Sequence, residues 1–210
     1  MQHLKFLNLK TDIQNIALGG STAQNKMVPD ERKKSLLKTP VTKKTKKAAV
    51  LALFYPNSHG ETCLALTLRA KYKGTHSAQV SLPGGKVEPS DKNLKETALR
   101  ETFEEIGIEQ HKIHVLREIT NVYIPPSNFL VTPFIGVIDF HPKFIPNPEV
   151  DKLIEVPLKN ILDEKLVLMD EKKTFYAENI KIPYYNFENH MVWGATAMII
   201  SEIKELLKRL

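Results

Sequence analysis

The chain has 210 residues, of which 42% are hydrophobic and 26% charged, enough for one well-packed domain with an extension. No apolar stretch approaches the roughly 18–20 residues of a transmembrane helix, so we expect no membrane partner. The N-terminus lacks the apolar core of a secretory signal, and Cys63 is the only cysteine, which excludes an intrachain disulfide. These features favour a reducing, cytoplasmic location, with Cys63 as a small core residue.

The net charge of +6 favours an anionic partner. Much of the excess lies in the basic stretch 32–47, which includes Lys43, Lys44, Lys46 and Lys47. We interpret this stretch as a solvated lead-in. Nucleic-acid binding is the alternative, but no aromatic residue alternates with the lysines to stack on bases, so we expect no nucleic-acid partner. Attraction of a phosphorylated small molecule is compatible with either interpretation.

The first predicted elements are a helix and a pair of strands. Residues 1–20 have the apolar spacing of an amphipathic helix that ends at Gly19-Gly20. The apolar run 48–55 predicts a buried strand, and residues 62–69 predict its partner after a turn at 57–60. Residues 70–85 are predicted to be mostly loop. We therefore divide the chain into an N-terminal helix with a basic lead-in, residues 1–45, and a domain, residues 46–210, that includes the C-terminal helix.

A second helix is predicted over residues 92–106. Ser90 or Asp91 is the expected N-cap, and Gly107 ends the helix as a left-handed residue. At 100° per residue, one face is predicted to pack in the core and the opposite face to carry acid. The packing residues are Leu99, Phe103 and Ile106, flanked by Ala98 and Thr102, and the acidic residues are Glu101, Glu104 and Glu105.

The three glutamates stand at positions i, i+3 and i+4, which share one face of a helix. Like charges at this spacing repel each other, so the cluster gains stability only when a cation lies beside it. Clusters of carboxylate oxygens suit hard divalent ions. The sequence therefore predicts a Mg²⁺ or Mn²⁺ site on this helix.

The rest of the chain alternates between strands and helix. Strands are predicted over residues 113–122, 130–140, 152–156 and 182–187, with a weaker hairpin over 167–176. From Trp193 onward, apolar residues recur with helical spacing to the C-terminus. This pattern predicts an α/β fold in which the 92–106 helix and the C-terminal helix flank a sheet.

The segment from Gly85 to Ile108 resembles the Nudix box, G-x5-E-x7-R-E-U-x-E-E-x-G-U, where U is a bulky aliphatic residue. It departs from the box in three places: Asp91 replaces the first Glu, the second spacer has eight residues, and Thr102 stands at the first U.

Residues 67–69 and 76–85 resemble the T-x-R…H-x-G-Q-V-S-F-P-G-G signature of the coenzyme A diphosphatase branch, which shares the Asp and the longer spacer. Ala78 and Leu82 depart from that signature. Further matches fall within 27–32, 125–134, 149–158 and 193–197.

The resemblance implies a Nudix-type α/β/α sandwich with a mixed sheet flanked by helices. It also implies hydrolysis, dependent on Mg²⁺ or Mn²⁺, of the diphosphate bond of a small nucleotide substrate. For coenzyme A or its derivatives the products are 3′,5′-ADP and 4′-phosphopantetheine. The alternatives are a Nudix hydrolase of ADP-ribose or NADH, a binding module without turnover, and an RNA-binding protein.

By this resemblance, Glu101 and Glu105 are direct metal ligands, and Glu104 is a further ligand and a candidate catalytic group. Arg100 is expected to orient the glutamates through an ion pair, and direct contact with phosphate is the alternative. The general base is one of these glutamates or a carboxylate on another loop. Substrate binding is expected from Arg69, His76, Gln79, Ser81 and Gly84.

Overall fold

The computed structural model describes residues 1–210 with the exception of 31, 34–40, 72–77 and 173–179. Its strands are β1 (Lys46–Pro56), β2 (Thr62–Arg69), β3 (Val80–Ser81), β4 (Gly84–Lys86), β5 (His114–Glu118), β6 (Val122–Ile124), β7 (Phe129–Val137), β8 (Val150–Pro157), β9 (Val167–Lys172), β10 (Ile180–Phe187) and β11 (His190–Val192). The α-helices are α1 (His3–Asn8), α2 (Lys10–Asn15), α3 (Gly20–Gln24), α5 (Leu94–Ile106), α6 (Leu158–Leu162) and α7 (Gly194–Leu207). Short 3-10 turns cover Asn25–Met27, Gln110–Lys112, Pro125–Ser127 and Glu164–Leu166.

The described strands form two sheets. In the larger sheet the order is β3-β2-β1-β7-β5, with β4 paired to β1, β6 to β7 and β8 to β2. β1 and β7 run parallel, and the other pairs in this sheet are antiparallel, so the sheet is mixed. The smaller sheet has the order β11-β10-β9.

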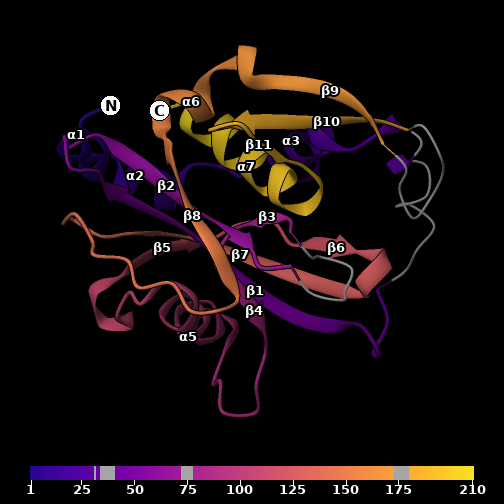
Figure 1. Ribbon diagram of the computed structural model, residues 1–210, viewed down its shortest axis with the longest axis horizontal. Coiled ribbons are helices and arrows are strands. Elements are labelled where there is room, and N and C mark those ends of the chain that lie inside the picture. Colours follow the sequence, from indigo (N-terminus) through magenta and orange to yellow (C-terminus); the bar gives the residue numbers. More distant parts are fainter. Residues whose placement is uncertain (31, 34–40, 72–77, 173–179) are drawn as a thin grey trace.

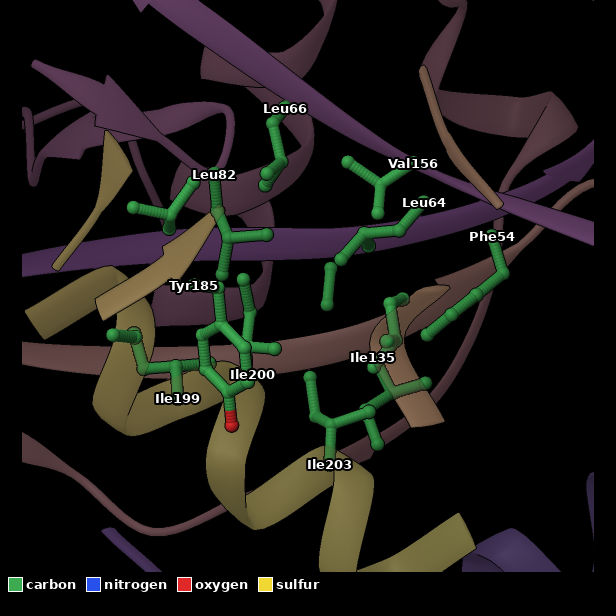
Figure 2. Packing of buried hydrophobic residues seen from close by; sticks show 14 of the residues in the cluster. Phe54, Leu64, Leu66, Leu82, Ile135, Val156, Tyr185, Ile199, Ile200 and Ile203 are labelled. Carbon is green, nitrogen blue, oxygen red and sulfur yellow. The ribbon is translucent and has the colours of Figure 1, made fainter. Parts of the chain in front are cut away.

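Helices cover both faces of the larger sheet (Figure 1). α5 lies against one face, and α7 lies with the smaller sheet on the other. Side chains of β1 alternate between two cores, because successive residues of a strand point to opposite faces. Leu51 and Leu53 pack with Ala98 and Ile106 of α5. The larger core, on the α7 side, gathers Leu64, Leu66, Tyr185, Ile199 and Ile203 (Figure 2). The predicted α/β/α sandwich with a mixed sheet is confirmed.

The N-terminal residues pack on the domain. Phe6 and Ile13 are fully buried in the α7-side core, and the Nε2 of His3 lies 2.8 Å from the carbonyl oxygen of Ile138. The single helix predicted over residues 1–20 is wrong in detail. α1 and α2 are separated by Leu9, the chain becomes extended at Ile16, and Gly20 begins α3 instead of following a helix.

The α5 helix differs from the prediction in its cap and its orientation. Asn93 is the N-cap, because its side chain accepts a hydrogen bond from the Glu96 amide. Phe103 is 47% exposed, whereas Glu105 is only 3% exposed. Ala98, Thr102 and Ile106 lie on the buried face as predicted, but this face includes Glu105 and leaves out Phe103. Gly107 does end the helix with a φ of 76°, as predicted.

Several predicted boundaries also shift. The 70–85 loop contains the short strands β3 and β4, and the strand predicted over 113–122 divides into β5 and β6. Of the weak hairpin over 167–176, residues 167–172 form β9, whose partner is β10, and residues 173–176 lie outside the described part. The thiol of Cys63 is buried on β2, and burial raises its pKa to about 11. No helix in the described ranges is long and apolar enough to cross a membrane.

Candidate active site

The turn at Gly84-Gly85 brings β4 close to both β1 and α5. A side chain at Gly84, whose φ is 150°, would collide with the Ala49 carbonyl and with Val50. A Cβ at Gly85 would lie 2.5 Å from the carboxylate of Glu101. Both glycines are therefore required for close packing, and the space beside Gly85 is filled by an acidic group.

Glu105 and Glu101 form a partly dry acidic pair on the α5 surface that faces this turn. The Gly84 amide donates to Glu105 Oε2 over 3.3 Å. Burial raises the pKa of Glu105 to about 7, and the guanidinium of Arg69 only partly offsets this. Burial also raises the pKa of Glu101 against the opposing effect of Arg100. Burial therefore disfavours the charged form of both glutamates.

Arg69 connects this pair to a carboxylate from a different part of the chain. Its Nη1 lies 3.4 Å from Glu105 Oε1, and its Nη2 lies 3.6 Å from Glu149 Oε2. Glu149 precedes β8, and its charge contributes to the raised pKa of both Glu101 and Glu105. Four glutamates, Glu101, Glu104, Glu105 and Glu149, therefore lie around two arginines.

Arg100 is held by Asp91 and faces two of the glutamates. Its Nε and Nη2 donate to the two oxygens of Asp91 over 2.9 and 3.0 Å. Its Nη1 lies 3.1 Å from Glu101 Oε1 and 3.1 Å from Glu104 Oε2. The ion pairs expected of Arg100 are therefore present. The bidentate contact explains the acidic residue at position 91, and it holds the pKa of Asp91 well below its usual range.

A pocket of about 1240 Å³ opens on the α7 side of the sheet, and its lining includes Gly84 and Arg69, which contact Glu105, but none of the α5 glutamates. This volume exceeds what a diphosphate alone requires and suits a nucleotide-sized ligand. Apolar side chains of β1, β7, β10 and α7 form much of its wall. The charged lining residues among those described are Arg32, Lys46, Arg69, Lys71, Lys86 and Glu149. The basic excess favours an anionic ligand.

The structure brings most of the predicted site residues together. The junction of α5 and β4 brings together Glu101, Glu105, Arg100 and Gly84. Arg69 reaches this junction from β2. Glu104 is at the exposed edge of the cluster. Gln79 and Ser81 line the pocket, and the Ser81 hydroxyl lies 3.2 Å from that of Thr67. His76 lies outside the described residues.

Sequence reasoning missed two site residues. Glu149 was part of a matched segment, but nothing in its spacing placed it beside α5, because β8 reaches Arg69 only through its pairing with β2. Asp91 stood at the first acidic position of the box, yet it was interpreted as a helix cap. Its spacing from Arg100 within the box was the available signal.

The possible ligands fit a hard divalent cation, because all of them are carboxylate oxygens. The carboxylates of Glu101 and Glu105 also lie where burial disfavours their charge, which a cation would offset. In the described part of the chain, no three acidic, histidine or cysteine side chains are already gathered as a complete metal site. Arg69 and Arg100 each form ion pairs with glutamates of the cluster. Glu101, Glu104 and Glu105 are the residues that could hold the ion.

Comparison with known proteins agrees with this geometry. The NUDIX domain profile matches residues 45–177. The chain is 35% identical over 172 residues to Nudix hydrolase 15, mitochondrial, of Arabidopsis thaliana, a match covering 79% of this chain and 60% of that protein. It is 35% identical over 147 residues to the Nudix hydrolase NudL of Yersinia pestis, covering 69% and 72%.

A solved structure shows the same fold. The Nudix hydrolase RenU from M. smegmatis superposes with a TM-score of 0.51 at 17% identity, covering 79% of this chain and 88% of that one. The profile match extends from the start of β1 past the acidic helix and the strand that follows Glu149. The chain therefore belongs to the Nudix hydrolase family.

Proposed function

We propose that this Nudix hydrolase cleaves the diphosphate bond of coenzyme A or its derivatives with Mg²⁺ or Mn²⁺. The observation that carries the proposal is an acidic cluster on α5 whose partners Gly84 and Arg69 line a basic pocket of about 1240 Å³. A pocket of this size accommodates a diphosphate together with two large substituents. The T-x-R and Q-V-S-x-P-G-G resemblance on β2, β3 and β4 supports coenzyme A as the substrate.

In the proposed reaction, water adds to one phosphorus, the bridging P–O bond breaks, and 3′,5′-ADP and 4′-phosphopantetheine leave. Glu101, Glu105 and Glu104 would hold the metal. When bound, it neutralises the diphosphate charge and acidifies water. Arg100 keeps Glu101 and Glu104 in place, and Gly84 allows β4 to pack closely against β1 beside these glutamates.

The proton of the attacking water needs an exposed carboxylate within the site. Glu104 and Glu149 are the two exposed glutamates of the cluster, with side chains 48% and 68% accessible. Glu149 also lines the pocket, so we propose it as the general base, with Glu104 as a further metal ligand. Arg69, Gln79 and Ser81 would bind the substrate, with His76 of the same signature.

A substrate panel with products identified by mass tests the proposal. With Mg²⁺ or Mn²⁺ present, kcat/KM for coenzyme A should exceed that for ADP-ribose and NADH by about tenfold or more, and 3′,5′-ADP should appear. Glu105→Gln should lower kcat about 100-fold or more, because it removes charge from the metal site. Glu109→Gln, on a surface ion pair outside the site, is the matched control and should keep normal rates. Equal or faster turnover of ADP-ribose would contradict the proposed substrate.

A further inference from the structure

Two lysines and a phenylalanine form a group at one end of the pocket that the proposed chemistry does not use. The Nζ of Lys46 lies 5.6 Å from the centroid of the Phe129 ring, and the Nζ of Lys86 lies 5.9 Å from the same centroid. All three residues line the pocket. Two ammonium groups therefore converge on one aromatic ring beside the ligand space.

Strand register places this group away from the acidic pair. Lys46 is opposite Phe129 in the parallel β1–β7 pair, and Lys86 is opposite Ala48 in the β1–β4 pair. Lys46, Ala48 and Val50 share the face that lines the pocket. Gly84 pairs with Val50, four residues from Lys46, a separation of about 13 Å at the usual rise of a strand. One nucleotide-sized ligand could therefore contact both ends.

The charges at this end favour a bound anion. Like charges held close together repel each other, and among the described residues neither ammonium is paired with a carboxylate. Ser127, two residues before Phe129, lines the same wall, and its buried hydroxyl has no hydrogen-bond partner in the described ranges. Two ammonium groups beside one ring, with an unsatisfied hydroxyl in the same pocket lining, suit a phosphate next to a planar group.

We propose that Lys46, Lys86 and Phe129 form a second anion subsite that binds a terminal phosphomonoester of the nucleotide substrate. The assignment rests on the proposed function and specifies which part of the substrate is recognised. The diphosphate lies at the Gly84 end, the base packs against Phe129, and the two ammonium groups contact the 3′-phosphate. The subsite thus selects coenzyme A over the analogue that lacks this phosphate.

The strand supplies a matched control. Lys47 carries the same charge next to Lys46, but it does not line the pocket, because adjacent residues point to opposite faces of the sheet. Lys47→Gln makes the same change in net charge as Lys46→Gln. An effect of general electrostatic attraction would appear in both variants, whereas a specific subsite would distinguish them.

The kinetic test compares coenzyme A with dephospho-coenzyme A. The ratio of their kcat/KM values should fall about tenfold in Lys46→Gln and in Lys86→Gln, because each removes one charge-assisted contact. The ratio should stay within about twofold of the wild-type value in Lys47→Gln. An unchanged ratio in both pocket variants, or an equal fall in Lys47→Gln, would overturn the subsite.

A binding test separates this subsite from the proposed reaction. Calorimetry in EDTA should show tighter binding of 3′,5′-ADP than of 5′-AMP, and Lys46→Gln and Lys86→Gln should remove most of that difference. This result supports the subsite even when the wild-type protein fails to hydrolyse coenzyme A, an outcome that contradicts only the proposed function. Equal binding of the two nucleotides to the wild-type protein would overturn the subsite, whatever the enzyme hydrolyses.

Discussion

Glu105 shows how a single side chain can be both well packed and electrostatically unfavourable. It lies on the buried stripe of α5, and the only groups that donate to it among the described residues are the Gly84 amide and Arg69. We predicted that this side chain lies on the exposed, acidic face of the helix, and the structure shows that it is buried. Because little water reaches the carboxylate, its charged form gains more from a cation than an exposed glutamate would.

The pH dependence of stability tests this description. The pKa of Glu105 is raised from 4.5 to about 7, so the folded state binds more protons than the unfolded state between these values. Protonated Glu105 therefore stabilises the folded state fully below pH 4.5. This stabilisation, up to about 3 kcal/mol of unfolding free energy, is lost as the pH rises through 7. In EDTA, the Glu105→Gln variant should therefore have a higher free energy of urea unfolding than the wild-type protein at pH 8. This difference in unfolding free energy should narrow toward pH 4.5. A wild-type protein that is the more stable of the two at pH 8 would refute the prediction.

A substitution at Asp91 tests how much its ion pair with Arg100 stabilises the fold. Asp91→Asn removes the bidentate partner of Arg100, so we expect a loss of roughly 2–3 kcal/mol in unfolding free energy at pH 7. Because Arg100 lowers the pKa of Asp91, this contribution is present above the ordinary value of 3.8 and is lost as the pH falls below it. The wild-type and variant unfolding curves should therefore converge in acid.

Glu88→Gln is the matched control for Asp91→Asn, since Glu88 lies 4.0 Å from Arg100 and its side chain is 58% accessible. It should change the unfolding free energy by less than about 0.5 kcal/mol. A loss in Glu88→Gln as large as that in Asp91→Asn would show that Asp91 has no special role in holding Arg100.

At the scale of elements, the N-terminal helices belong to the core of the domain. Phe6 packs against Phe54 of β1 with ring centroids 4.8 Å apart, and the buried carboxylate of Glu202 on α7 accepts from Gly20, Gln24 and Thr120. α7 thus holds both the N-terminal segment and the β5–β6 connection.

The prediction at this scale compares two apolar residues of α1. Phe6→Ala should cost about 3–5 kcal/mol of unfolding free energy, because it removes a fully buried ring. Leu4→Ala, at a position that is 78% exposed, should cost less than about 0.5 kcal/mol. Equal losses in chemical unfolding would mean that α1 does not pack as described.

At the scale of the whole molecule, periodicity predicted the elements better than their orientation. β2 begins and ends at the predicted residues, and Gly107 ends α5 as expected, because turn and cap chemistry is local. Glu105 was placed on the exposed face of α5, because helical periodicity does not encode its contact with β4. Likewise, Lys46 was grouped with the solvated lysines, and only the β1–β7 register shows that it lines the pocket. The box glutamates were predictable from spacing, whereas Glu149 required the β2–β8 pairing.

The single thiol has a practical consequence. Cys63 is 1% exposed, and burial raises the pKa of its thiol to about 11, so we expect an alkylating or disulfide-forming reagent to react slowly with it in the native protein. Cys63 is the second residue of β2, so labelling requires a local opening around this end of the strand. The rate of thiol modification therefore reports how often this part of the structure opens, and no engineered cysteine is needed.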